Sequence, residues 1–298
     1  MPRSFSDDDL DAAAAFLAGR HARHREAEPL LPADIDFRAE VEAAWRSPGA
    51  SGAVSESGFL LGAPREDPVW GPNVWVELAG HAVEEPEAVR DLYAFAAQRW
   101  VEEGNTRHYV IVPAADTQLL DAWFRLGFGQ QHAVALLEVP GEVAWPERVR
   151  LAQPHDVDSL VALAPLLADH QALAPVFGPG RTDWDEAGMR GKIVEDVAAG
   201  DVLVAAGDGS PVGCVYMAEA EPGLHRPRSA FLAWAAIVPE ARGTGVGLAL
   251  MQASLAWARS RGYDVIATDW RVTNLLSSRF WPRRGFRTTF LRLYRSIP

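Results

Sequence analysis

Residues 231–247 read FLAWAAIVPEARGTGVG, an apolar run that leads directly into a glycine-rich loop. The run, Phe231 to Val238, has the length of one strand, and its continuous apolar character predicts a strand buried on both faces of a sheet. Pro239 lacks the N–H group that the next ladder position needs, so the strand is expected to end there. From Leu248 to Arg261 the apolar residues follow helical spacing, and Gly262 suits the residue that stops a helix. The loop is therefore expected between a buried strand and a helix N-terminus.

A glycine loop in that position favours phosphate binding, because free backbone N–H groups and the positive end of the helix dipole converge there. Its spacing is not the G-x-G-x-x-G of dinucleotide-binding folds, and no Lys follows it as a P-loop requires. It fits R-x-x-G-x-G, with Arg242, Gly245 and Gly247 in the fixed places. Taken alone, the loop is also compatible with a plain strand-to-helix turn.

A second motif follows the loop at a set distance. Tyr263 to Asp269 is expected to form the next strand, and the segment NLLSSRFWPRRGF then begins at Asn274. It has an Asn that opens a short helix, an aromatic residue seven positions later and a closing Gly-Phe pair. Together the two motifs resemble the GCN5-related N-acetyltransferases (the GNAT superfamily), and the resemblance runs from about Val149 to the C-terminus.

The first half of the chain repeats the order of the second. Gly104 and Gly127 are 23 residues apart, as are Gly262 and Gly285. In both copies a Trp lies four residues before the second Gly and a Phe follows it, namely Trp123 and Phe128, then Trp281 and Phe286. We therefore predict an α/β fold of two tandem GNAT-like domains, each a mixed central sheet flanked by helices, at residues 1–143 and 147–298.

The first copy is expected to be degenerate and to lack a CoA site. It has no Gly between His81 and Glu103, and Glu84, Glu85 and Glu87 supply the negative charge at the helix start that a pyrophosphate would otherwise supply. Residues 1–143 carry 11 Lys and Arg against 24 Asp and Glu, a net charge of −13, whereas residues 144–298 carry 17 against 16, or +1. CoA is itself strongly anionic, so the acidic half is an unfavourable host.

The resemblance implies transfer of an acetyl group from acetyl-CoA to a primary amine of a small molecule or peptide. In this family a β-bulge opens the strand before the loop, and a backbone N–H there binds the thioester carbonyl; Val238 would supply it, with Ile237 alongside. The acetyl-CoA contacts that the resemblance implies are Ile237, Val238, Arg242, Gly243, Thr244, Gly245, Val246, Gly247, Asn274, Ser277 and Trp281. We expect one CoA per chain, between strands 231–238 and 263–269.

The general base is less well defined by the sequence. The strand 231–238 lacks the glutamate that many family members carry, and the resemblance then favours an acid five residues before the Asn, which is Asp269. Asp269 is also compatible with an ion pair to Arg271 or with a helix cap, and a water molecule is a further alternative. Other groups that could line the acceptor groove are Glu219, Glu221, Asp169 and His170.

The position of the family's usual acid, a Tyr seven residues after the Asn, is occupied by Trp281. An indole N–H donates a hydrogen bond but does not release its proton at neutral pH. This departure leaves two functions open. One is an N-acetyltransferase, and the other is a non-catalytic sensor or scaffold that binds CoA or acetyl-CoA. The sequence does not identify the amine.

Composition and motifs also indicate the cell compartment and the partners to expect. A single Cys, Cys214, and no Cys/His spacing typical of a metal site predict a metal-free protein of a reducing cytoplasm. The acidic N-terminus lacks the apolar region of a signal peptide, and no run reaches the ~18 apolar residues of a membrane span. No nucleic-acid motif accompanies the C-terminal arginines, so nucleic acid is not an expected partner. The chain is expected to act as a monomer, with the first copy as an intramolecular pseudo-dimer partner for the second.

Overall fold

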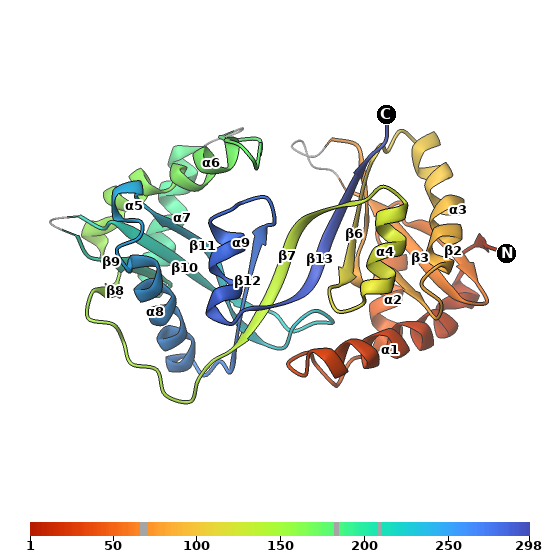
Figure 1. Ribbon diagram of the computed structural model, residues 1–298, viewed down its shortest axis with the longest axis horizontal. Coiled ribbons are helices and arrows are strands. Elements are labelled where there is room, and N and C mark those ends of the chain that lie inside the picture. Colours follow the sequence, from red (N-terminus) through yellow and green to blue (C-terminus); the bar gives the residue numbers. More distant parts are fainter. Residues whose placement is uncertain (66–70, 182–184, 208–209) are drawn as a thin grey trace. The chain divides into compact units, whose positions relative to one another are not determined.

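The computed structural model describes residues 1–65, 71–181, 185–207 and 210–298. They form two compact units (Figure 1): unit 1 comprises Met1–Ala135, Pro222–Pro227 and Arg287–Pro298, and unit 2 comprises Leu136–Glu221 and Arg228–Phe286. Each unit combines a mixed sheet with flanking helices, so the predicted fold class is confirmed.

Unit 1 is built on strands in the order β1-β2-β3-β4-β6-β13-β7, with β5 paired to β3. The pair β4–β6 is parallel, with Trp75 opposite Tyr109, while β1 to β4 pair antiparallel in succession. Its elements are β1 (Arg3–Ser4), η1 (Asp7–Asp9), α1 (Leu10–Ala27), α2 (Phe37–Trp45), β2 (Ser51–Ser55), β3 (Gly58–Pro64), β4 (Asn73–Val76), η2 (Leu78–Gly80), β5 (His81–Val83), α3 (Ala88–Glu102), β6 (Arg107–Pro113), α4 (Thr117–Arg125), the first part of β7 (Gly129–Glu138) and β13 (Arg287–Ser296), where η marks a short 3-10 helix.

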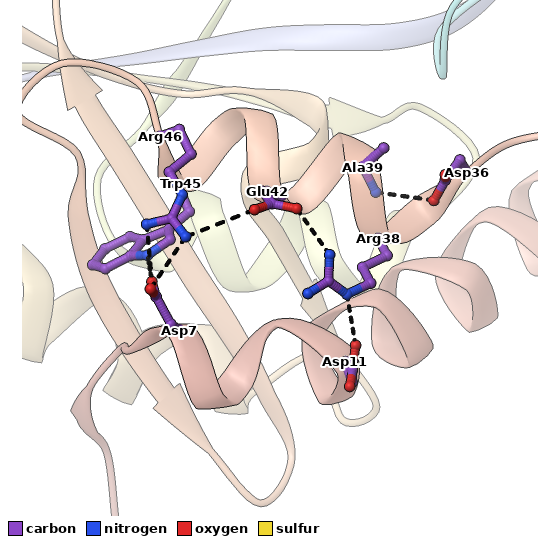
Figure 2. Close-up of polar contacts among 8 residues, drawn as sticks. All are labelled: Asp7, Asp11, Asp36, Arg38, Ala39, Glu42, Trp45 and Arg46. Carbon is purple, nitrogen blue, oxygen red and sulfur yellow. Dashed lines mark hydrogen bonds and ion pairs between the residues drawn. The ribbon is translucent and has the colours of Figure 1, made fainter.

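Helices α1 and α2 of unit 1 are joined by a chain of ion pairs on their exposed side (Figure 2). Arg38 binds Asp11 at 2.9 Å and Glu42 at 2.8 Å, and Arg46 binds Asp7 at 3.1 Å. Because these side chains are largely exposed to solvent, such ion pairs contribute little to stability. Asp7 and Asp11, at the start of the first helical segment, thus hold α2 beside it.

Unit 2 has the strand order β12-β11-β10-β9-β8, in which β11–β12 is parallel and the other pairs are antiparallel. Its elements are the end of β7, β8 (Val149–Leu151), η3 (Pro154–Asp156), α5 (Val157–Leu163), α6 (Pro165–Ala172), α7 (Glu186–Ala199), β9 (Val202–Ala205), β10 (Gly213–Ala220), β11 (Ser229–Ile237), η4 (Pro239–Ala241), α8 (Val246–Ser260), β12 (Val265–Arg271), α9 (Ser277–Phe280) and η5 (Pro282–Arg284).

Helices cover both faces of the unit 2 sheet. On one face Leu160 of α5 and Ile193 of α7 pack with Cys214 of β10 in a buried apolar cluster. On the other, a Cβ added at Gly213 would lie 3.2 Å from Leu250 of α8. Since neighbouring strand residues point to opposite faces, α8 lies on the face opposite α5 and α7, as the left of Figure 1 shows.

The unit boundaries differ from the predicted division at 1–143 and 147–298. The chain leaves unit 1 within β7, between Ala135 and Leu136, and its last segment returns there as β13. Strand β13 pairs antiparallel with β6, placing Leu293 opposite Val110, and Leu293 is fully buried. The alternating pattern of β13 identifies it as a strand but not which strand it pairs with, because pairing depends on the folded sheet.

The internal repeat is present in the structure. The order α3–β6–α4–β7 of unit 1 matches α8–β12–α9–β13, and both long helices end at a left-handed glycine, Gly104 with φ 87° and Gly262 with φ 77°. In each case the glycine N–H and the next N–H bond back to the last turn, as in a Schellman motif. The two halves therefore share helix-end chemistry as well as element order.

Candidate functional site

The glycine loop has the geometry that its sequence predicts. After η4, Gly243 adopts φ 78° and Gly245 adopts φ 85°, values that residues with a Cβ rarely take. Gly245 is the N-cap of α8, and the hydroxyl of Thr244 donates to the carbonyl of Ala241 at 2.7 Å, which fixes the turn. The two left-handed glycines let the chain reverse directly from β11 into the start of α8.

The N-terminus of α8 carries unsatisfied donors. The first N–H bond of the helix runs from Ala249 to the carbonyl of Gly245 at 3.1 Å, and no side chain caps the helix. The N–H groups of Val246, Gly247 and Leu248 therefore have no partner within the helix. A Cβ at Gly247 would lie 3.2 Å from Ile237 and 3.4 Å from the Phe280 ring, so this position is closely packed. These features suit a bound phosphate group.

Exposed arginines surround the loop. Arg148 donates to the carbonyl of Thr244 at 3.2 Å, and Arg242 donates to that of Ile237 at 3.4 Å. The Arg284 guanidinium lies 5.1 Å from the centre of the Phe280 ring, which itself borders Gly247. Within the described parts of the chain, none of these three exposed arginines forms an ion pair with a carboxylate. Their charge is available to an anionic ligand.

Strands β11 and β12 separate next to the loop. Their parallel register runs from Ala230 opposite Ile266 to Leu232 opposite Thr268 and goes no further. On the other edge of β11 the register with β10 shifts between Tyr216 and Met217, which leaves Ala233 as the bulged residue. Ala233 is exposed, so the prediction that this strand is buried on both faces was wrong beyond Leu232. The bulge is a long-range feature that the local sequence does not show.

The backbone N–H of Val238, which was expected to bind the thioester carbonyl, is already hydrogen-bonded within the sheet. The Val238 N–H donates to the carbonyl of Val212 at 3.0 Å, on the β10 side of the strand. N–H groups alternate in direction along a strand, so those of Ile237 and Ala235 point towards β12, where the register has ended. The N–H groups that face the opening are therefore those of Ile237 and Ala235, whereas the N–H of Val238 faces β10.

Asp269 lies in β12 one residue beyond the last pair with β11, and its side chain is exposed. Its neighbour Thr268 faces the other side and donates to the carbonyl of Leu232 at 3.1 Å. Asp269 and Arg271 share one face of the strand, and Arg271 donates to the Gln171 side chain at 3.1 Å. Asp269 is thus positioned at the mouth of the β11–β12 opening.

The alternative acids that the sequence suggested are tied to arginines or lie on the surface. Glu219 is exposed and pairs with Arg228 at 2.7 Å. Asp169 pairs with Arg181, whose hydrogen bond holds the pKa of Asp169 below its usual value. Glu221 is exposed. Among these carboxylates, Asp269 is the one that lies on a strand at the opening.

Asn274 is buried and caps the helix that follows it. Its side-chain oxygen accepts the N–H of Leu276 at 3.1 Å and that of Ser277 at 3.4 Å, and it lies 3.2 Å from Nε2 of His170. The hydroxyl of Ser277 donates back to the Asn274 carbonyl at 3.4 Å. Both residues, which were expected to contact acetyl-CoA, use these groups to shape the turn between β12 and α9.

Trp281 lies in the core of unit 2. It is buried and makes edge-to-face contacts with Phe280, at 4.8 Å between ring centres, and with Phe286, at 5.3 Å. Trp281 thus packs in the core, and its expected contact with acetyl-CoA stays a prediction. Trp123 makes the same edge-to-face contact with Phe128 in unit 1.

A cavity of about 400 Å³ lies on the face of the unit 2 sheet that α6 and α7 cover. It borders Ala233 and Trp234 of β11 and Arg271 of β12, and it extends to Tyr216 of β10. Tyr216 lies within the apolar run Val212 to Met217, so no sequence pattern marks it as a binding residue. Only the packing of α6 and α7 on the sheet shows that it borders a cavity.

Residues 170–286 match the model of the acetyltransferase (GNAT) family, so this segment of the chain is a GNAT domain. Over 57 residues, 19% of the chain, the sequence is 44% identical to aminoglycoside N(6')-acetyltransferase type 1 of Klebsiella aerogenes. The match spans 38% of the length of that curated relative.

Solved structures show the same fold over the full chain. A GCN5-related N-acetyltransferase from Sphaerobacter thermophilus is 15% identical with a TM-score of 0.62, covering 99% of this chain and 95% of that one. A GNAT-family acetyltransferase from Colwellia psychrerythraea is 10% identical with a TM-score of 0.52, and each chain is covered completely. A tandem GNAT protein from the clavulanic acid biosynthesis pathway is 15% identical with a TM-score of 0.51, covering 99% and 98%.

The described residues also bear on membrane insertion and metal binding. No helix there has both the length and the apolar character that crossing a membrane requires. In the same residues, no three His, Cys, Asp or Glu side chains come together as a metal site would require.

Proposed function

We propose that unit 2 transfers the acetyl group of acetyl-CoA to a primary amine of a small molecule or peptide. The observation that carries this proposal is the uncapped N-terminus of α8, reached through Gly243 and Gly245 beside the opening between β11 and β12. Acetyl-CoA, when bound, supplies an acetyl group activated as a thioester. The amine-modifying relative named above supports the choice of an amine as acceptor.

The residues of the loop fit such a ligand. The N–H groups of Val246, Gly247 and Leu248 are placed to hold a pyrophosphate, and the exposed arginines add charge of the right sign. The N–H groups of Ile237 and Ala235 face the opening and are placed to bind a carbonyl oxygen in the manner of an oxyanion hole. The same N–H groups would stabilise negative charge that develops on that oxygen.

Asp269 is proposed to take the proton of the amine, directly or through a water molecule. A free alkylamine has a pKa near ~10.4, so it must lose a proton before it becomes a nucleophile. No acid is needed at Trp281, because a thiol with a pKa near ~8.5 is a tolerable leaving group. The burial of Trp281 among aromatic rings is compatible with a reaction in which this residue supplies no proton.

Unit 1 is proposed to bind no CoA, which gives one CoA per chain. At the start of α3 the N–H groups of Ala88 and Val89 are bonded to the carbonyls of Glu85 and Pro86, at 2.9 and 3.3 Å. Glu87 places a carboxylate at the same helix end. The first N–H groups of α8 have no partner within the helix, whereas the first N–H groups of α3 are hydrogen-bonded to preceding carbonyls. We propose that the chain acts as a monomer with one active unit.

The activity is tested by following thiol release from acetyl-CoA with and without amines, drawn from polyamines, amino acids, aminoglycosides, arylalkylamines and peptides with free N-termini. The proposal expects at least one amine to stimulate release well above the rate of hydrolysis. Tight binding of acetyl-CoA without stimulation by any of these amines would instead favour a CoA sensor or scaffold.

A further inference from the structure

The cavity beneath α6 and α7 has the position of a binding site in unit 2. It borders Ala233, the bulged residue where β11 parts from β12, and Arg271 of β12. It also borders Tyr216 of β10, the strand on the other side of β11 from β12. Its volume of about 400 Å³ falls within the ~300–1,000 Å³ typical of small-molecule pockets.

The walls of the cavity are mainly apolar. Leu167 of α6, Met189 and Ile193 of α7 and Trp234 of β11 all face it. The Trp234 ring lies 4.9 Å from the ring of Tyr216 at 71°, so the two aromatic rings form one edge-to-face surface. Such walls favour a ligand with an apolar body, because burying apolar surface contributes about 25 cal/mol per Å².

One polar group in the cavity has no protein partner. The Tyr216 hydroxyl is buried and forms no hydrogen bond with a described residue. Burial raises the pKa of Tyr216, so the group remains a neutral O–H donor. A buried hydroxyl without a partner is unfavourable, and a ligand oxygen that accepts a hydrogen bond from it would remove that penalty.

The charged groups around the cavity are unfavourable for a polycation. Lys192 and Asp196 of α7 line it as an ion pair, and Arg271 adds a second cation. Among the lining residues that the structure describes, two are positively charged and one is negatively charged, and that carboxylate is paired with Lys192. A ligand with several ammonium groups would meet like charges and, among those described lining residues, no unpaired carboxylate.

We propose that this cavity binds the acceptor, and that the acceptor is a monoamine with an apolar body and one oxygen that accepts a hydrogen bond from Tyr216. The amine lies beside Ala233, next to the opening of the strands, and the oxygen lies beside the Tyr216 hydroxyl. This rests on the N-acetyltransferase activity proposed above. It separates the chain from the aminoglycoside-modifying relative, because an aminoglycoside carries several ammonium groups.

Tyramine and 2-phenylethylamine test the proposal, because they differ only by the oxygen that Tyr216 would bind. We expect kcat/KM for tyramine to exceed that for 2-phenylethylamine by about tenfold, as one hydrogen bond of ~1.4 kcal/mol predicts. Kanamycin and spermidine should be acetylated at least about 100-fold less efficiently than tyramine. Efficient acetylation of either polycation would overturn the proposal.

Tyr216→Phe keeps the ring and its contact with Trp234 but removes the hydroxyl. This variant should lose the preference for tyramine and bring the two amines within about twofold, with acetyl-CoA affinity unchanged. Tyr263→Phe is the matched control, since Tyr263 belongs to the same unit and does not line the cavity. An equal loss with both amines in Tyr216→Phe would contradict the assignment of the oxygen.

Calorimetry with tyramine alone separates this inference from the proposed activity. If tyramine binds to the wild-type chain and binds more weakly to Tyr216→Phe, the cavity assignment stands even where no thiol is released. If thiol is released with other amines but tyramine neither binds nor reacts, the activity stands and the acceptor class proposed here is wrong.

Discussion

Trp281 and Trp123 occupy corresponding positions in the two halves of the chain. In each half the N–H of the following Phe bonds to the Trp carbonyl at 3.3 Å, and the two rings meet edge to face. Since Trp123 has this arrangement in the unit without a glycine loop, the arrangement belongs to the fold. Trp281 is therefore a structural residue in the place where many family members have a Tyr acid.

Replacing Trp281 with the family's residue tests this interpretation. Trp281→Tyr should not raise kcat, and it should lower the free energy of unfolding by about 1–3 kcal/mol, because a smaller ring leaves space and buries a hydroxyl in an aromatic cluster. Trp123→Tyr serves as the control and should be destabilised by a similar amount. A clear rise in kcat for Trp281→Tyr would show that this position can supply an acid.

Asp269 is the carboxylate on which the proposed chemistry depends. Asp269→Asn keeps the shape of the side chain but removes its basicity, so kcat should fall by about 10²-fold while acetyl-CoA affinity is retained. The acid limb of the pH–rate profile should also move. Asp264→Asn is a suitable control, since Asp264 precedes the same strand and pairs with Arg259 on the surface. A normal rate and profile in Asp269→Asn would return Asp269 to a structural role.

At the scale of elements, α6 is connected to the turn between β12 and α9. His170 contacts Asn274, and Gln171 contacts Arg271. The short helix α9 depends on Asn274, whose side-chain oxygen accepts two of its first N–H groups. The turn thus connects α6, which lines the cavity, to α9, whose Phe280 ring borders Gly247 of the glycine loop.

Loss of this cap should be measurable as a loss of stability. Asn274→Ala should lower the free energy of unfolding by about 0.5–2 kcal/mol, the usual range for a lost N-cap, and denaturant titration measures it. Asn274→Asp retains an oxygen acceptor, so it should lose much less. Equal losses in the two variants would mean that the cap is not what Asn274 contributes.

The sequence was most informative where structure is determined locally. The glycine loop, the helix after it and the stop at Gly262 depend on residues close together in the chain, and each was predicted correctly. The bulge at Ala233 and the bond from Val238 to Val212 depend on the register with β10, which no local pattern specifies. Tyr216 was missed for the same reason, since its cavity is formed by helices from another part of the chain.

At the scale of the whole chain, the two units are not contiguous in sequence. The last strand, β13, belongs to unit 1 and pairs with β6 from Phe290 opposite Pro113 to Ser296 opposite Arg107. The internal repeat predicted two similar domains. It did not predict that the last strand of the chain pairs within unit 1, because both copies end in a strand of similar pattern.

This connectivity predicts the behaviour of a fragment. Residues 146–298 expressed alone should be poorly soluble, since β13 would expose an unpaired edge and the apolar side chains of Phe290 and Leu293, which are buried in the full chain. Size-exclusion chromatography and the soluble fraction after expression measure this. A stable, monodisperse and fully active fragment would show that unit 2 does not need the strand pairing seen in unit 1.

One glycine loop, at the start of α8, is proposed to bind one acetyl-CoA per chain. Gly245→Asp places a charge and a Cβ at the N-cap, next to Arg148, whereas Gly262→Asp imposes the same left-handed strain at the other end of the same helix. Calorimetric titration of acetyl-CoA should give one equivalent for the wild type and for Gly262→Asp, with affinity at least tenfold weaker in Gly245→Asp, about 1.4 kcal/mol. Two equivalents per chain, or an unchanged affinity in folded Gly245→Asp, would contradict the claim.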